Sequence, residues 1–133
     1  MKKLRQIIAL TLVLGCASAL AEWTEIDRFE DGTRIYADRG NTQRNGDISQ
    51  VLHLVRWGEA QADPGQAPYL STLVRTAYDC ANKHEKYLAS TSFAGPMGDG
   101  ERVVADEDAA PNWASISEGS MEEKLWKIAC GVD

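Results

Sequence analysis

The sequence has few of the residues that build catalytic and metal sites, with two histidines and three cysteines among 133 residues. A catalytic thiol would need a base beside it, and only His53 and His84 are available. No second histidine or cysteine lies at metal-ligand spacing from His53, and the region of His84 lacks the HExxH pattern. We therefore predict no catalytic residues, no metal site and no cofactor, although triads assemble in space and spacing alone does not exclude an enzyme.

Each histidine has a more ordinary interpretation. His53 lies between Leu52 and Leu54, which favours a packed structural side chain, with a ligand or a base as the alternative. For His84 and Glu85 we expect a solvated strand start.

Positive charge and long apolar runs are also scarce. The formal net charge is −6, and without the first 21 residues it becomes −9, since 11 basic residues then face 20 acidic ones. An acidic surface repels phosphate backbones, so we expect no nucleic-acid partner. No apolar stretch reaches the roughly 20 residues of a transmembrane helix, and no internal repeat or low-complexity tract is present.

The N-terminus has the three parts of a secretory signal peptide. Met1–Arg5 is basic, Ile7–Leu14 is an apolar run too short to span a bilayer, and Ala19–Ala21 matches the A-x-A cleavage pattern. We predict a signal peptide over residues 1–21 and a single domain over residues 22–133.

Cys16 leaves a second option for export. The sequence "VLGC" resembles a lipoprotein signal, in which the cysteine is lipidated and becomes the first mature residue. Leu14 before Gly15 suits that signal poorly, so we favour cleavage after Ala21. Cys16 is kept as the candidate lipidation site, and with it an outer-membrane lipoprotein as the alternative to a soluble exported protein.

The remaining two cysteines, Cys80 and Cys130, predict a disulfide, because an even count in an exported protein favours pairing. The two-residue period of the preceding strand places Cys80 on the same side as Val74 and Tyr78. Closing a loop of about 50 residues would stabilise the fold by roughly 4 kcal/mol.

Most of the domain has the pattern of short strands separated by turn residues. Ser49–Trp57 is apolar on both faces, which predicts a central strand. Asp31-Gly32 and Asn45-Gly46 are turn signals, and Gly58–Pro68, with two prolines and no periodicity, is expected to be a loop throughout. The predicted strands are residues 23–29, 33–39, 49–57, 69–80, 84–93 and 102–104.

The C-terminal segment changes to a helical pattern. Ser120 and Glu123 form a capping box, apolar residues recur at helical spacing, and Gly131 suits the position after a helix. We predict a helix over Met121–Ala129 that stops at Cys130. So short a helix is marginal alone and must dock against the sheet.

Three further segments have competing interpretations. "AGPMGDGE" (Ala94–Glu101) is interpreted as a hairpin turn, because it lacks the Gly-Lys-Ser/Thr end of a phosphate loop. Asp106–Asp108 lacks the ligand pattern of a calcium loop and is expected to be solvated. Trp113 is either an exposed binding aromatic or packed under the helix beside Trp126.

Several stretches together resemble the surface-adhesin protein E family of Gram-negative bacteria. They are Trp23 soon after the signal peptide, "RIYADRGNTQRNGDISQVLHLVRW", "STLVRTAYDCANKHEKYLASTSFAGPMGDGE" and "NWASISEGSMEEKLWKIAC". The resemblance implies an α+β fold, an antiparallel sheet of about six strands with the C-terminal helix packed on one face and tethered by a disulfide. It also implies a surface lipoprotein that can form a homodimer and bind host matrix or serum proteins such as vitronectin and laminin.

We therefore expect an exported, non-enzymatic binding protein on the cell surface or in the periplasm. Recognition would use the sheet face that the helix leaves uncovered, or the loops Gly58–Pro68 and Glu101–Trp113. The alternative is a periplasmic structural or accessory protein, or an inhibitor of a secreted enzyme, because a shared fold does not secure adhesion.

Overall fold

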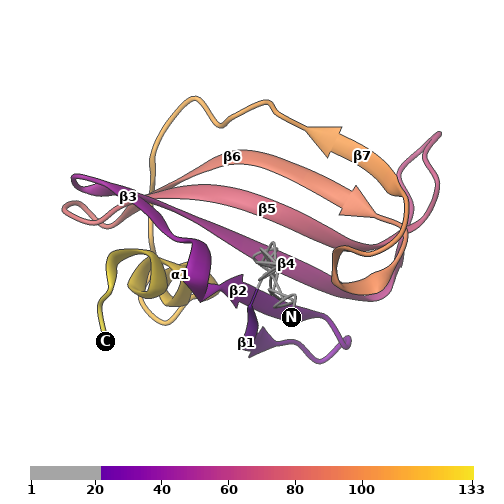
Figure 1. The fold of residues 1–133 in the computed structure, drawn as a ribbon, viewed down its shortest axis with the longest axis horizontal. Coiled ribbons are helices and arrows are strands. Elements are labelled where there is room, and N and C mark those ends of the chain that lie inside the picture. The colour runs from indigo at the N-terminus through magenta and orange to yellow at the C-terminus, as the bar shows by residue number, and fades with distance from the viewer. Residues whose placement is uncertain (1–21) are drawn as a thin grey trace, which may run out of the picture.

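The computed structural model describes residues 22–133, which fold around one antiparallel sheet (Figure 1). The predicted signal peptide and Cys16 lie outside these residues. The elements in chain order are β1 (Trp23–Arg28), β2 (Arg34–Asp38), the 3-10 turn η1 (Arg39–Asn41), β3 (Gln43–Asn45), β4 (Ile48–Gln61), β5 (Tyr69–Asp79), β6 (His84–Phe93), the 3-10 turn η2 (Pro96–Gly98), β7 (Arg102–Asp106), β8 (Ala114–Ser115) and α1 (Met121–Cys130).

The strand order confirms the predicted fold class. Six strands follow the order β1-β2-β4-β5-β6-β7, while the short strands β3 and β8 add to β4 and β6. The long strands β4, β5 and β6 form the centre, where Leu54 pairs with Leu73 and Leu73 with Thr91. The central position predicted for Ser49–Trp57 is therefore confirmed.

The loop prediction for Gly58–Pro68 is wrong at its N-terminal end. β4 continues to Gln61, which pairs with Tyr69. Gly58, the first residue of the expected loop, lies within the strand and allows close packing, because a Cβ there would lie 2.1 Å from the carbonyl oxygen of Asp31. Its amide also donates a hydrogen bond to Thr33 Oγ1 at 3.2 Å. Gly58 thus lets the turn between β1 and β2 lie directly against β4.

Helix α1 begins as predicted and ends one residue later than predicted. The hydroxyl of Ser120 accepts a hydrogen bond from the amide of Glu123 at 3.1 Å, and Gly131 takes the left-handed conformation at φ 65°. The buried face of the helix carries Leu125, Ala129 and Cys130. They pack against a core cluster that also contains Ala37, Val51 and Tyr78 from the sheet.

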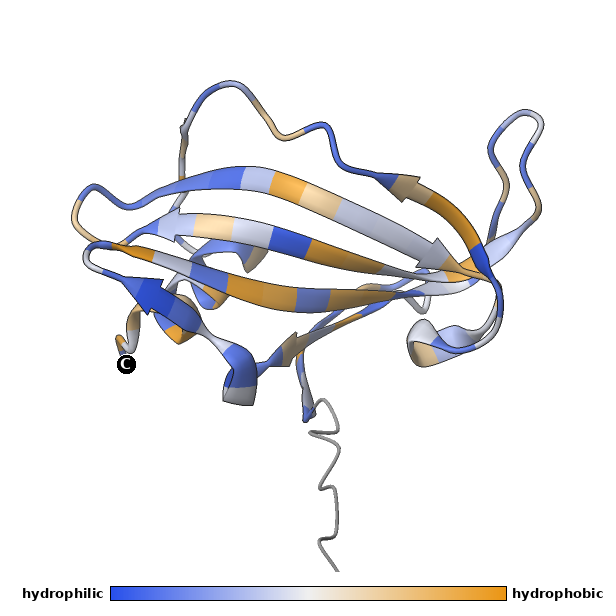
Figure 2. Cartoon of the chain, turned by 45° about the horizontal axis from the view of Figure 1, so that its top comes forward, coloured by the Kyte–Doolittle hydropathy of each residue, from blue (hydrophilic) through white to orange (hydrophobic). Residues whose placement is uncertain are grey.

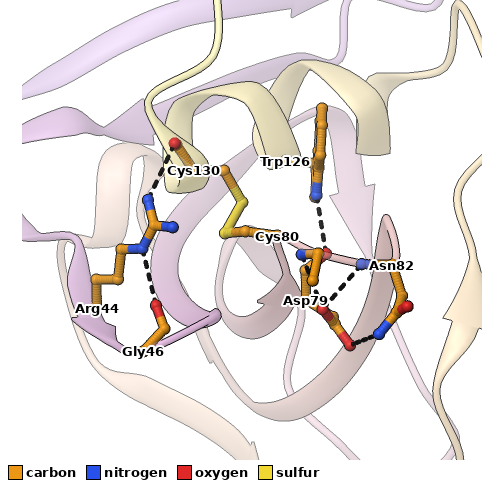
Figure 3. The surroundings of a disulfide bond; sticks show 8 residues. Arg44, Gly46, Asp79, Cys80, Asn82, Trp126 and Cys130 are labelled. Carbon is orange, nitrogen blue, oxygen red and sulfur yellow. Dashed lines mark hydrogen bonds between the residues drawn. A yellow bond between two sulfur atoms is a disulfide. The ribbon is translucent and has the colours of Figure 1, made fainter.

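The disulfide and two hydrogen bonds hold the end of α1 to the sheet (Figure 3). Cys80 and Cys130 are bonded across a Cα–Cα distance of 5.6 Å, as predicted from the sequence. Trp126 Nε1 donates to the carbonyl oxygen of Asp79 at 3.0 Å, and Arg44 Nη1 donates to the carbonyl oxygen of Cys130 at 3.2 Å. Two hairpins of the sheet therefore anchor the last turns of the helix.

The sheet has two unlike faces. We call the one against α1 the helix face and the opposite one the open face; in Figure 2 the helix lies behind the central strands. The turn that contains η2 covers one end of the open face, where Ser71 Oγ donates to Gly95 O at 2.7 Å and accepts from Gly98 N at 2.9 Å. Leu54 is only 1% exposed there. The remainder of the open face reaches solvent between β4 and β6.

Candidate functional site

The open face carries an arginine among apolar side chains. Leu52 and Arg75 are cross-strand partners, and both line two shallow hollows of about 130 and 160 Å³. Leu73 and Ala89 line the second hollow and are only partly buried. Arg75 is exposed and forms no ion pair with any residue in the range 22–133. This face can therefore offer apolar contact together with a donor for a carboxylate.

The helix face carries a separate pocket of about 210 Å³ between α1 and strands β4, β5 and β6, which we call the helix-face pocket. The strand register brings its polar groups together, since Thr76 pairs with Tyr87 and Tyr78 pairs with Glu85. Helix α1 adds Glu122 from its first turn. Residues from three strands and from α1 thus line one hollow, although α1 is distant from these strands in sequence.

The electrostatics of the helix-face pocket are set by burial and by two carboxylates. Burial, and then the charge of Glu122, raise the pKa of Glu85. Burial, and then the charge of Glu85, raise the pKa of Tyr78. Neither glutamate forms an ion pair within the described part of the chain. The pocket is therefore a site of uncompensated negative charge.

His53 lines this pocket from β4 and is 7% exposed. Burial lowers its pKa to about 4, so the ring is neutral at neutral pH. Its Nδ1 is buried and has no hydrogen-bond partner within residues 22–133. The packed position predicted for His53 is found, but the ring faces a polar pocket.

The prediction for Glu85 needs correction. It is half-buried against the helix, where we expected a solvated strand start, because the first residues of β6 lie beneath the first turn of α1. Glu122 had no functional interpretation in the sequence. An acidic residue in the first turn of a helix is explained by the helix dipole alone, so only the docking of α1 reveals its position beside Glu85.

The two C-terminal tryptophans lie in different environments. Trp113 is 39% exposed, with Lys86 Nζ 5.9 Å from its ring centroid. Trp126 is half-buried, with Lys83 Nζ 5.3 Å from its ring centroid. Trp113 is accessible to a ligand, and its role as a binding aromatic stays a prediction.

The segment Ala94–Glu101 forms the hairpin between β6 and β7, as predicted. Ala94 N donates to Glu101 O and Gly95 N donates to Asp99 O, each at 2.9 Å, while Gly98 N donates to Ser71 Oγ. These three amides are therefore not free to cradle a phosphate.

The acidic run that begins at Asp106 also bonds within the chain. Asp106 accepts hydrogen bonds from Asp108 N at 2.9 Å and from Tyr87 Oη at 3.0 Å. Across residues 22–133, no three His, Cys, Asp or Glu side chains are grouped so that they could hold a metal ion. In the same residues, no helix is long and apolar enough to cross a bilayer.

Comparison with known proteins identifies the fold and the family. The chain is similar to the structure of crystal form II of Haemophilus influenzae protein E, with a TM-score of 0.64 and 16% identity over 80% of this chain and 87% of that one. It is also similar to protein E from non-typeable Haemophilus influenzae, with a TM-score of 0.61 and 16% identity over 82% and 81% of the two chains. A comparison with curated proteins gave no significant match. The family model for Surface-adhesin protein E matches residues 23–131, so the chain belongs to the surface-adhesin protein E family.

Proposed function

We propose that this protein is an exported adhesin that binds a host extracellular-matrix or serum protein, of the vitronectin or laminin kind, without catalysing a reaction. The observation that carries the proposal is the open face, which α1 leaves uncovered in a chain of an adhesin family. Leu52, Leu73 and Arg75 supply partly exposed apolar surface and an unpaired cation. Arginine is enriched at protein interfaces and is a frequent source of binding energy.

The absence of catalysis is supported by the state of His53. A general base works best with a pKa near the operating pH and within reach of the proton it removes. His53 is almost fully buried, and its pKa is lowered to about 4. It is therefore a weak base at neutral pH.

The proposal is tested by binding of the exported, disulfide-bonded protein to immobilised vitronectin and laminin. We expect saturable binding in the micromolar range or tighter, weakened several-fold by Arg75→Ala and unchanged by Arg39→Ala. Arg39 is a matched control because it is exposed and lies in η1, outside the hollows of the open face. Absence of saturable binding to both proteins would contradict the adhesin proposal.

Location separates the adhesin from a periplasmic accessory or inhibitor protein. Protease treatment of intact cells should remove a surface adhesin and leave a periplasmic protein intact. The intact mass of the exported protein reports whether cleavage follows Ala21 or a lipid is attached at Cys16. Full protection from protease on intact cells, with release on permeabilisation, would favour the periplasmic alternative.

A further inference from the structure

The polar side chains of the helix-face pocket have no role in the proposed function. Two carboxylates, Glu85 and Glu122, approach it from β6 and α1, and the buried ring of His53 lines it from β4. The nearby lysines are engaged elsewhere, because Lys83 pairs with Glu123 and Lys124 pairs with Asp27. Within residues 22–133 neither glutamate has an ion-pair partner, so a cation supplied by a ligand could compensate both carboxylates.

The two like charges of Glu85 and Glu122 do not lie on a fully exposed surface. Both glutamates are half-buried, where their mutual repulsion is screened less than in open solvent. Burial, and then the charge of Glu122, raise the pKa of Glu85, so the two carboxylates repel each other and a bound cation would relieve that repulsion. His53 lines the pocket with a ring that is uncharged at neutral pH and whose buried Nδ1 has no hydrogen-bond partner within residues 22–133.

The shape and the apolar walls indicate the kind of cation. At about 210 Å³, the pocket is smaller than the roughly 300–1,000 Å³ of sites that enclose a whole drug-sized ligand. Val74, Met121 and Leu125 line it beside the carboxylates. Such a lining suits one functional group on an aliphatic stem, which buries its methylenes and directs its charge to the acids.

We propose that the helix-face pocket binds a primary ammonium group on an aliphatic stem, as presented by a lysine side chain of a protein ligand or by a free polyamine. An ammonium is a compact charge with three donors, which suits acceptors that arrive from different directions better than the planar fork of a guanidinium does. The lysine source rests on the proposed adhesin function and adds to it a residue type that the partner must expose. The proposal that the pocket binds an ammonium group does not depend on the adhesin function.

The test is a titration of the exported, disulfide-bonded protein with blocked lysine (Nα-acetyl-lysine-N-methylamide), followed by NMR of backbone amides. Putrescine serves as the free amine, and Nα-acetyl-norleucine-N-methylamide as the uncharged analogue of similar stem. We expect saturable shifts at His53, Glu85 and Glu122 with the amines and none with the norleucine compound. Tighter binding of blocked lysine assigns the source to a protein, and tighter binding of putrescine assigns it to free polyamines.

Variants then locate the site. Glu85→Gln and Glu122→Gln keep side-chain size, and each should weaken ammonium binding by roughly tenfold, as expected for a charge-assisted contact. Glu101→Gln removes the same charge from an exposed position outside the pocket and should change nothing. The comparison of charged and uncharged probes on the unmodified protein remains decisive if a variant does not fold.

Two results would overturn the inference: no saturable shift with either amine, or equal weakening by Glu101→Gln and the pocket variants. Its failure is distinguishable from failure of the proposed function. Binding of matrix proteins without binding of an amine would contradict only this inference. Binding of an amine without binding of a matrix protein would contradict only the adhesin proposal.

Discussion

Trp126 Nε1 lies 3.0 Å from the backbone carbonyl oxygen of Asp79 and donates a hydrogen bond to it, one residue before the disulfide cysteine Cys80 (Figure 3). The helix is thus held to the end of β5 both by a covalent bond and by an indole that fits over the same turn. Below the indole, Asp79 accepts hydrogen bonds from Ala81 N and Asn82 N, each at 3.0 Å, which fixes the turn. The position of α1, and with it the helix-face pocket, depends on this arrangement.

Trp126→Phe should therefore loosen the helix without removing its aromatic packing. We expect a loss of about 1 kcal/mol in the free energy of unfolding, the usual contribution of one hydrogen bond. Denaturant unfolding followed by circular dichroism measures the difference. Trp113→Phe, at an exposed position, is the matched control and should change stability by less than about 0.5 kcal/mol. Equal effects of the two substitutions would show that the Asp79 contact adds nothing.

The disulfide should contribute more than the hydrogen bond. The substitution of both Cys80 and Cys130 by serine releases a loop with a sequence separation of 50, which should lower the free energy of unfolding by roughly 4 kcal/mol. Calorimetry measures the shift in Tm, and amide hydrogen exchange at Leu125 and Ala129 reports local opening of α1. Chemical reduction of the unmodified protein should reproduce the change. A variant that melts at the original temperature would show that the disulfide does not stabilise the fold.

Gly58 should tolerate no side chain. A Cβ there would lie 2.1 Å from Asp31 O and 2.9 Å from the carbonyl carbons of Asp31 and Gly32, which are backbone atoms that cannot rotate away. We expect Gly58→Ala to destabilise the protein by about 1–3 kcal/mol, the usual cost of overpacking. Gly40→Ala is the control, because its Cβ would meet only Asp38 Oδ1 at an ordinary 3.7 Å. Equal unfolding midpoints for the two variants would contradict the close packing of the β1–β2 turn on β4.

The main strands and the helix were predictable because their signals are local. Alternating apolar residues mark the central strand, and the capping residues Ser120 and Gly131 mark the helix ends. The end of β4 was not predictable, because the residues after Trp57 have no strand periodicity and Gly58 is required by close packing against a distant turn. Whether such a glycine breaks a strand depends on a turn 27 residues earlier at Asp31, which local patterns do not contain.

The helix-face pocket was not predictable for a related reason. Glu85 and Glu122 are far apart in sequence, and each has an ordinary explanation where it stands. Only the strand register and the docking of α1 bring them to one hollow with His53. The disulfide prediction contained the missing information in part, since it placed the helix near the end of β5 without fixing which residues of the helix face the sheet.

Protonation of His53 should make stability depend on pH between about 4 and 6.5. Its pKa is about 4 in the folded protein against an ordinary 6.5, so in this window the unfolded chain binds a proton that the folded protein does not. Stability therefore rises with pH here, and it should fall by about 1–2 kcal/mol from pH 6.5 to pH 5. Glu85, whose pKa is raised, opposes this effect at the acidic end, because its protonation favours the folded state.

Urea unfolding at pH 6.5 and pH 5 should give a smaller difference for His53→Gln, which cannot take up the proton, than for the unmodified protein. Glu85→Gln removes the opposing contribution and should enlarge the difference. The other titratable groups that line the pocket with His53, which are Glu122, Tyr78 and Tyr87, stay in place in both variants. An unchanged pH dependence in His53→Gln would show that the folded protein accommodates the protonated ring, and would place His53 in a more solvated position than the structure does.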